Sequence, residues 1–298
     1  MPDAPIRQAR TSSTTMGILP AGACDTHFHI FGPARKFPFA PERTYTPADA
    51  SFEMMRAMHA RLGIQRGVVV QPNCHGFDMS ATLDALLRGE GQYRAVALVP
   101  SEVSRAELER LDKAGVRGVR FNIMPRLGDS ATPQDMAAMA ARIADLGWHL
   151  CIHTQGATLP ELLPVLKSLP VPYIIDHMGR VDASQGLRGS AFQAILALRG
   201  RPGAWVKISG VDRLSGGHAP YSQGCDFMRA LLDAMPEQLL WGTDWPHPNV
   251  AGATPDDMAL RNLFLDLCPG QDLREQILVH NPQTLYRFEQ AIPKGETS

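Results

Sequence analysis

The sequence lacks the features that mark membrane proteins and nucleic-acid-binding proteins. No stretch approaches the roughly 18 consecutive apolar residues that a membrane-spanning helix needs. Charge of one sign is not in excess either, because the chain contains 29 Lys and Arg residues and 30 Asp and Glu residues. Nucleic-acid-binding proteins usually carry a basic surplus. Residues 1–20 are mostly polar and contain no apolar signal-peptide core. We therefore expect a cytoplasmic protein that binds neither membranes nor nucleic acids.

Cysteines are few and scattered. The five are Cys24, Cys74, Cys151, Cys225 and Cys268, and no two of them form a C-x-x-C pair. An odd number at irregular spacing argues against a disulfide framework and against a structural zinc site built on cysteine. An apolar core must then hold the fold together, and a chain of 298 residues is long enough to bury a large one.

The chain does contain a regular alternation of short apolar runs and helix-like segments. Eight runs are rich in apolar residues, and several are β-branched and nearly continuous, as is typical of strands covered on both faces. They span residues 22–31, 66–72, 93–100, 116–123, 148–153, 171–177, 204–210 and 238–244. Helices are expected at residues 49–63, 104–115, 132–147, 159–169, 189–198, 221–235, 256–269 and 272–288.

This alternation predicts an α/β fold in which parallel strands are joined by helical crossovers. Eight such units in 298 residues suit a single (β/α)8 TIM barrel. The alternative is an open doubly wound sheet, but the first strand is not followed by G-x-G-x-x-G. No repeat or linker indicates a second domain. We expect residues 1–20 to form a flexible lead-in and residues 21–298 to form the barrel, with the long loop 31–50 over its mouth.

Polar residues gather where the predicted strands end, which is where barrel enzymes build their active sites. They are Asp25, His27, His29, Asn73, His75, Arg120, Asn122, Arg126, His153, His177, Arg180, Arg213, Asp244 and His247. Alternation along the first strand points His27 and His29 to the same side, into the barrel. A single histidine there would most often be a core residue. Five histidines at or just beyond strand ends (His27, His29, His75, His153 and His177, with His247 in the loop after the last strand) are harder to obtain by chance. We therefore expect Asp244, held in the stiff segment "WGTDWPHPN", to face a site there.

Two chemistries fit these residues. In the first, His27, His29, His153, His177 and Asp244 surround a zinc or manganese ion, and a bound zinc ion lowers the pKa of its water to about 7. In the second no metal takes part, the histidines hydrogen-bond a substrate carbonyl, and Asp244 removes a proton from water. Both end in hydrolysis.

Four arginines near the strand ends indicate the charge of the substrate. Arg120 lies within an apolar strand, Arg126 follows it, and Arg180 and Arg213 come after two other strands. The fork-shaped guanidinium group suits planar carboxylates. Several such groups at one site predict a substrate with two or more negative charges.

At these positions the chain resembles the amidohydrolase superfamily, through H-x-H on the first strand, histidines on the fifth and sixth, and Asp on the eighth. Within it, the chain is similar to the 2-pyrone-4,6-dicarboxylate lactonases, and the likeness covers nearly everything after residue 20. The segments that carry it are "DTHFHIFGP", "FPFAPERTYTPADAS", "NCHG", "GVRFN", "IDHMGR", "DRL" and "WGTDWPHPN".

The resemblance implies a role for each matching residue. Asp244 would activate water, and His27, His29 and His177 would surround the lactone carbonyl. The residues expected to contact substrate are Tyr45, Asn73, His75, Arg120, Arg126, His153, Arg180, Arg213 and His247. One position departs from the pattern, because these metal-free lactonases carry Tyr at the end of the fifth strand. His153 stands there in this chain and is a ligand type of metal-dependent relatives.

We therefore expect a hydrolase that opens the ring of a small anionic lactone, with 2-pyrone-4,6-dicarboxylate as the leading substrate and no required cofactor. That compound is an intermediate in the microbial breakdown of lignin-derived aromatics. The first alternative is a zinc-dependent hydrolase of 4-sulfomuconolactone or of a sugar-acid lactone. A metal-dependent decarboxylase is the alternative from another class, and a non-catalytic binding protein would not need Asp244 among histidines. We expect a monomer or a small homo-oligomer.

Overall fold

The computed structural model describes residues 17–124, 131–250 and 252–289. Eight parallel strands follow one another around a single sheet in the order of the sequence. They are β1 (Cys24–Phe28), β2 (Arg66–Val70), β3 (Tyr93–Ala97), β4 (Val116–Ile123), β5 (His149–Thr154), β6 (Tyr173–Ile175), β7 (Ala204–Lys207) and β8 (Leu239–Leu240). All lie within the eight runs expected from the sequence, apart from Thr154 at the end of β5.

The sheet closes between β1 and the extended segment that follows β8. The amide of Thr26 donates to the carbonyl of Trp241 at 3.0 Å, and the amide of His29 donates to the carbonyl of Trp245 at 2.8 Å. In the opposite direction, the amide of Asp244 donates to the carbonyl of His27 at 2.8 Å. The predicted (β/α)8 barrel is confirmed, and its seam holds Asp244 beside the first strand.

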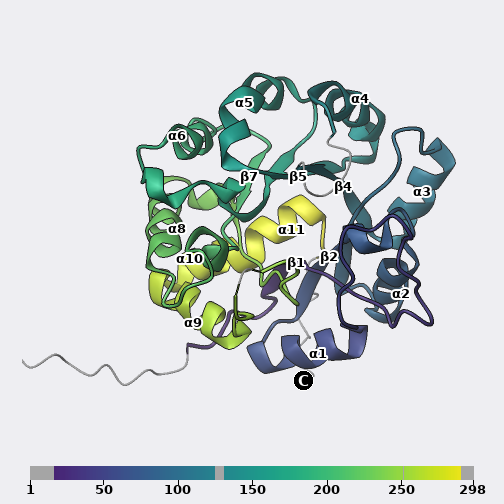
Figure 1. Ribbon diagram of the computed structural model, residues 1–298, viewed down its shortest axis with the longest axis horizontal. Helices are drawn as coiled ribbons and strands as arrows, with labels where there is room; N and C mark the ends of the chain where they lie inside the picture. The colour runs from purple at the N-terminus through teal and green to yellow at the C-terminus, as the bar shows by residue number, and fades with distance from the viewer. Residues whose placement is uncertain (1–16, 125–130, 251, 290–298) are drawn as a thin grey trace, which may run out of the picture.

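Helices surround the barrel (Figure 1). They are α1 (Phe52–Leu62), α2 (Ser80–Arg88), α3 (Arg105–Ala114), α4 (Pro133–Ile143), α5 (Leu159–Ser168), α6 (Ser190–Leu196), α7 (Val211–Leu214), α8 (Ser222–Ala234), α9 (Asp257–Leu267), α10 (Gln271–Glu275) and α11 (Asn281–Tyr286). Several begin at a residue whose side chain caps the helix. Thr132 and Asp135, for example, form a reciprocal capping box before α4, which satisfies amides at the helix start.

Three helix predictions need correction. Helix α2 was not expected; Met79, directly before it, makes no side-chain capping bond, and the amide of Ser80 donates instead to the carboxylate of Asp78 at 2.9 Å. Helix α7 was not expected either, because four residues are too few to show a helical period. The helix expected over 272–288 is divided into α10, a π-helical turn at Gln276–His280, and α11. A π turn keeps the same apolar pattern over a few residues, so periodicity alone does not reveal it.

The C-terminal helix closes one end of the barrel. In Figure 1, α11 lies across the middle of the ring of strands. Tyr286 and Leu285 pack into the same buried cluster as Val68 and Ile174, and Arg94, near the start of β3, donates to the carbonyl of Arg287. Because these contacts lie near the amino-terminal ends of the strands, the carboxyl-terminal ends are left to build a site.

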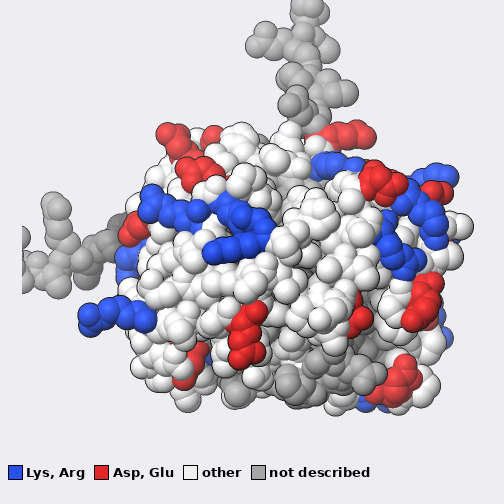
Figure 2. All heavy atoms as spheres, turned by 90° about the horizontal axis from the view of Figure 1, so that it is seen from above, with Lys and Arg blue, Asp and Glu red and all other residues white. Residues whose placement is uncertain are grey.

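The packed structure begins earlier than the expected lead-in allows. Leu19 is buried in the core cluster, whereas residues 1–16 lie outside the described residues. Among the described residues, no helix combines the length and the apolar character needed to cross a membrane. Figure 2 shows acidic and basic side chains on the same face of the molecule, around a broad uncharged area.

Candidate active site

Asp244 is fixed by the backbone that surrounds it. Its φ of 63° lies in the left-handed region, which a non-glycine residue adopts only when its surroundings impose it. The preceding Thr243 supplies part of that constraint, because its amide and its hydroxyl both donate to the buried carboxylate of Asp25, at 3.0 and 2.6 Å. Asp25 also accepts from the amide of His27 at 3.0 Å. This carboxylate therefore ties the first strand to the segment that carries Asp244.

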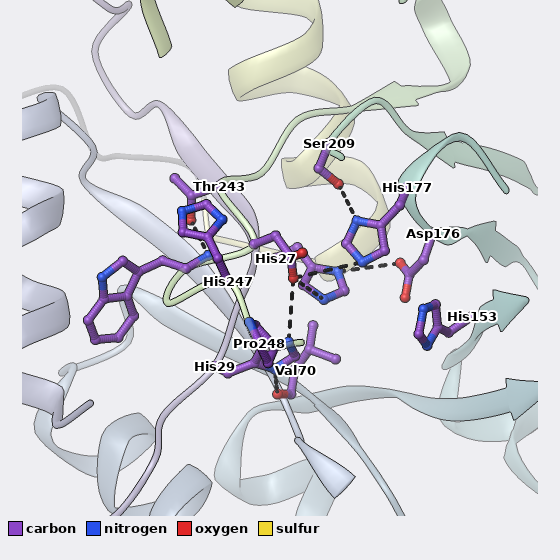
Figure 3. Close-up of polar contacts among 12 residues, drawn as sticks. His27, His29, Val70, His153, Asp176, His177, Ser209, Thr243, His247 and Pro248 are labelled. Atoms are coloured by element: carbon purple, nitrogen blue, oxygen red, sulfur yellow. Dashed lines mark hydrogen bonds and ion pairs between the residues drawn. The ribbon is translucent and has the colours of Figure 1, made fainter. Parts of the chain in front are cut away.

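Three imidazoles face one oxygen of Asp244. Its Oδ1 lies 3.7 Å from Nε2 of His27, 3.6 Å from Nε2 of His29 and 3.8 Å from Nε2 of His177. The rings of His27 and His177 are 4.5 Å apart (Figure 3). The expected convergence of these four side chains is therefore present in the structure.

The second ring nitrogen of His29 and of His177 has its own partner. Nδ1 of His29 lies 2.7 Å from the carbonyl of Val70, and Nδ1 of His177 lies 2.9 Å from the hydroxyl of Ser209. Figure 3 shows both contacts as dashed lines, from His177 to Ser209 and from His29 to Val70. A carbonyl can only accept, so Nδ1 of His29 must carry a proton, whereas a hydroxyl can donate or accept. Burial holds the pKa of His29 below its usual value and that of His177 well below it.

His177 and Arg180 lie on an unusual turn that follows β6. Residues 177–180 all have positive φ, from 46° to 64°. The turn packs against Gly210, where an added Cβ would lie 2.9 Å from Cβ of His177. Only glycine fits that approach without displacing the histidine. The turn therefore aims two polar side chains from neighbouring positions toward the same cavity.

Arg213 contacts the other oxygen of Asp244. Its Nε lies 2.7 Å from Oδ2, and its Nη2 also donates to Oδ2. Burial alone would raise the pKa of the Asp244 carboxyl, but the charge of Arg213 and the facing imidazoles hold it well below its usual value. Asp244 is therefore an ionised carboxylate with one oxygen directed at the histidines.

A cavity opens above this cluster. The residues that line it are His29, Tyr45, Asn73, Arg120, His153, His177, Arg180, Arg213, Asp244, Pro248 and Asn249. Tyr45 comes from the loop 31–50, whose ends pair through Phe31 and Ala50, so this loop does reach the barrel mouth. Arg126 lies outside the described residues.

Three of the expected site residues do not line the cavity. His27 is fully buried beside it. His75 instead accepts from the amide of Gly32 at 3.3 Å, and its Nδ1 lies 3.0 Å from the carbonyl of Pro38. His247 contacts Asp257 at 2.9 Å, and despite burial this carboxylate raises the pKa of His247. His75 and His247 therefore hold loops at the cavity rather than facing into it.

His153 belongs to a chain of amide contacts on the opposite wall. Its Nδ1 lies 3.1 Å from Oδ1 of Asn122, and Nδ2 of Asn122 donates to Oδ1 of Asn73 at 2.8 Å. Burial, and next the charge of Arg120, hold the pKa of His153 well below its usual value. His153 is therefore a neutral group that faces His177 at a ring distance of 5.7 Å.

The sequence analysis did not single out the buried charges beneath the cavity. Lys207 on β7 and Asp176 after β6 are both fully buried, and Nζ lies 3.0 Å from Oδ1. The signal was present, because each charge interrupts an apolar strand, in "AWVKIS" and in "YIIDH". A charged residue inside such a run is rarely buried without a partner.

The spacing of the cluster is suited to a metal ion. Among the described residues, His27, His177 and Asp244 each offer a ligand atom within 4.8 Å of the other two. His29 and His153, also expected as ligands, lie outside this mutually close group, although Nε2 of His29 is 3.6 Å from Oδ1 of Asp244. His27, His177 and Asp244 are therefore the residues whose mutual spacing suits an ion.

The chain is similar to known hydrolases over almost its whole length. Residues 24–288 match the amidohydrolase family. The 2-pyrone-4,6-dicarboxylate hydrolase of Comamonas testosteroni is 43% identical over 277 residues, which cover 90% of this chain and 91% of that protein. The 4-sulfomuconolactone hydrolase of Hydrogenophaga intermedia is 37% identical, with 90% of each chain covered.

A solved structure agrees with these matches. The probable 2-pyrone-4,6-dicarboxylic acid hydrolase of Acinetobacter baumannii, with citric acid bound, superposes with a TM-score of 0.78 at 27% identity, covering 90% of this chain and 100% of that one. The chain therefore belongs to the amidohydrolase family. It is an enzyme of the hydrolase class, and the resemblance drawn from its motifs is confirmed.

Proposed function

We propose that this protein opens the ring of a small lactone that carries two negative charges, with 2-pyrone-4,6-dicarboxylate as the first substrate to test. The observation that carries the proposal is the meeting of Asp244 and its histidines with Arg120, Arg180 and Arg213 in one cavity. The proteins at 43% and 37% identity support it, because both are named as hydrolases of anionic lactones.

Arg213 and Arg120 have different partners in the structure. Arg213 is paired with Asp244, whereas Arg120 donates to the carbonyl of Gln71 at 3.3 Å, a neutral partner that leaves its charge uncompensated there. Arg180 lines the same cavity. Arg120 and Arg180 are the groups we assign to the substrate carboxylates, since guanidinium groups bind carboxylates through paired hydrogen bonds. The citric acid in the Acinetobacter structure supports a polycarboxylate ligand in this family.

Water activation follows from the protonation of His29. Its proton is on Nδ1, facing Val70, so a neutral His29 offers only a lone pair at Nε2. That lone pair and Oδ1 of Asp244 are 3.6 Å apart and are both acceptors. A water molecule that donates to both would be oriented with its oxygen free to attack. Asp244 then takes the proton as general base, a role typically worth about 10²- to 10⁴-fold in rate.

The carbonyl needs a donor on its oxygen, and His177 is the best placed. When Ser209 donates to Nδ1 of His177, the proton of the ring is on Nε2 and faces the cavity. Attack by water gives a tetrahedral intermediate whose negative oxygen this N–H stabilises. The ring C–O bond then breaks, and the protonated Asp244 returns its proton to the leaving oxygen. In this proposal His29 accepts a hydrogen bond from the water, and His177 donates one to the carbonyl oxygen. The two histidines thus take different roles, although both were expected around the carbonyl.

A metal-dependent hydrolase of 4-sulfomuconolactone or a sugar-acid lactone is the second candidate. The group of His27, His177 and Asp244 favours it by spacing. The donor chemistry does not fit, because Nδ1 of His27 lies 3.0 Å from the ammonium of Lys207. A nitrogen that accepts from an ammonium leaves the ring proton on the other nitrogen, where a metal would need a lone pair. We therefore propose that no metal is required.

The deciding experiment is a hydrolysis assay on a panel of lactones, run beside metal analysis of the purified protein. The panel contains 2-pyrone-4,6-dicarboxylate, 4-sulfomuconolactone, a sugar-acid lactone and the uncharged 2-pyrone as control. We expect the highest kcat/KM for 2-pyrone-4,6-dicarboxylate, in protein treated with chelator. Preference for the uncharged pyrone, or release of carbon dioxide without ring hydrolysis, would overturn the proposal.

A further inference from the structure

A buried ion pair, Lys207 and Asp176, lies beneath the cavity. Its lysine contacts His27 of the catalytic cluster. Lys207 and Asp176 are both fully buried, and their charges are 3.0 Å apart. Burial alone would lower the pKa of Lys207, but Asp176 raises it above the usual value, so the ammonium is retained. Lys207 and Asp176 pair a cation and an anion in a barrel core where apolar residues of the same size would pack without a desolvation cost. Stability of the fold alone therefore does not explain why a charged pair lies there.

The hydrogen bonds of Lys207 account for all three of its protons. Nζ lies 3.0 Å from Oδ1 of Asp176, 3.0 Å from Nδ1 of His27 and 3.6 Å from Sγ of Cys151. Sγ of Cys151 in turn lies 3.2 Å from each oxygen of Asp176, to which its thiol donates. An ammonium has three donors and no acceptor. His27 must therefore accept at Nδ1 if no buried proton of Lys207 is to be left without a partner.

The opposite protonation of His27 would place two donors face to face. A proton on Nδ1 would point at the ammonium 3.0 Å away, in a site that water does not reach. Oδ1 of Asp176, which also lies near Nδ1, is farther away at 3.4 Å. An unpaired buried donor costs about 1–3 kcal/mol, and more when it is charged. At the other side of the ring, Nε2 of His27 is buried and faces the carboxylate oxygen Oδ1 of Asp244 at 3.7 Å, which suits a protonated nitrogen.

We propose that Lys207 is a positioning residue, which fixes the proton of His27 on Nε2, facing Asp244 and the reaction centre. The inference deepens the proposed metal-free function and rests on it. His27 then presents an N–H toward Oδ1 of Asp244, 3.7 Å away, and stabilises the ionised base. The same N–H denies a metal ion the lone pair that His27 would have to supply as a ligand. Lys207 thereby selects between the two chemistries that the sequence left open.

The first test reads the tautomer of His27 in the unmodified protein. Two-bond proton–nitrogen NMR correlations of protein labelled with ¹⁵N-histidine distinguish a bare ring nitrogen from a protonated one, and the spectrum of His27→Gln assigns the signal. We expect a bare Nδ1 and a protonated Nε2 in chelator-treated protein. A protonated Nδ1 with a bare Nε2 overturns the inference. The measurement needs no substrate, so it stands apart from the lactone assay that tests the proposed function.

The second test changes the charges. Lys207→Met alone would leave Asp176 without a counter-charge, so the double variant Lys207→Met/Asp176→Asn is measured beside it. We expect the single variant, if folded, and the double variant both to lose the fixed tautomer. The double variant should lose at least 10-fold in kcat, keep KM within about 3-fold, and bind Zn²⁺ more tightly than the unmodified protein in calorimetry.

The matched control is Cys151→Ala, which removes the thiol but keeps the contact between Lys207 and His27. Its His27 tautomer and its Zn²⁺ affinity should equal those of the unmodified protein. An unchanged tautomer in the folded double variant would show that Lys207 does not determine it. Equal losses in the control and in the double variant would mean that Lys207 only fills the core, and would likewise overturn the inference.

Discussion

Arg213 donates through Nε to Oδ2 of Asp244 at 2.7 Å, and its Nη2 contacts the same oxygen. One carboxylate oxygen of Asp244, Oδ2, is therefore bonded to the guanidinium group, and the other, Oδ1, faces the imidazoles. This pairing stabilises the ionised form of Asp244, but it also makes the carboxylate a weaker base, because a lower pKa means a lower proton affinity. A substrate carboxylate that drew Arg213 away from Asp244 would strengthen the base when the substrate binds.

The pH profile of an Arg213 variant tests this relationship. Arg213 lowers the pKa of Asp244, so Arg213→Met should raise it. The ionised base is then lost at a higher pH as the pH falls, and the acid limb of kcat/KM, which reports the free enzyme, should move to higher pH. The measurement is kcat/KM from pH 4 to pH 8 in both proteins. Arg110→Met, which removes an exposed partner of Glu107, is the control. An acid limb at the same pH in both variants would contradict the assignment.

Replacing the base itself should stop the reaction. Asp244→Asn keeps the shape of the side chain but cannot take a proton, so we expect kcat to fall by at least about 10²-fold. Substrate or product-analogue binding, measured by calorimetry, should persist. A variant that retains more than a tenth of the activity would remove Asp244 from the role of general base.

Charge recognition by Arg120 and Arg180 predicts a selective loss of affinity. Arg120→Met or Arg180→Met should raise KM for a dianionic lactone by about 10- to 150-fold, since a buried hydrogen bond to a charged group contributes about 1.5–3 kcal/mol. KM for an uncharged lactone should change little. Arg126→Met belongs in the same series, because the sequence assigns it the same role. Equal effects on the charged and the uncharged lactone would show that these arginines do not read substrate charge.

His153 separates the two mechanisms. If it only lines the substrate cavity, activity survives chelation, and His153→Tyr stays partly active because tyrosine can replace its contact with Asn122. If it is a metal ligand, purified protein should hold about one equivalent of zinc or manganese, which the variant should lose. Metal analysis and activity before and after chelation are the measurements. Activity lost on chelation and restored by added metal would exclude the metal-free reaction.

Buried histidines should make the stability of the fold depend on pH. Burial lowers the pKa of His27 and of His149 to about 3. The folded state then binds fewer protons than the unfolded chain, where histidine titrates near a pKa of about 6.5. The free energy of unfolding is therefore fully retained above that pH and falls below it, by about 1.4 kcal/mol per pH unit for each such histidine.

His149 allows this prediction to be checked away from the active site. It is buried and packs against Tyr286, at a ring distance of 5.1 Å. His149→Leu should reduce the difference in unfolding free energy between pH 7.5 and pH 5, as measured by urea denaturation. Catalysis at pH 7.5 should be retained. A pH dependence as steep as that of the unmodified protein would show that His149 is not a source of it.

The sequence by itself determined the barrel and the edge of the barrel at which the site lies. Apolar runs and helix signals are local patterns, and a polar residue at the end of a strand stands out against the run that precedes it. The sequence therefore predicted that one site contains His27, His29, His177 and Asp244, with the arginines around them. Helix α2 was missed although the carboxylate of Asp78 accepts from the amide of Ser80 at its start, because the residue directly before the helix, Met79, is not a capping residue.

Only the tertiary structure decided which way the side chains face and which groups they meet. His75 and His247 stand at strand ends like the others, yet they hold loops through Pro38 and Asp257. The partner of His27 is Lys207, 180 residues away along the chain. Whether such a hydrogen bond forms is decided by differences of a few tenths of an ångström in the distance between two side chains. The side chains come from strands far apart in the sequence, so no local pattern encodes the bond. The protonation of a buried imidazole depends on contacts of this kind, and only the packed barrel supplies them.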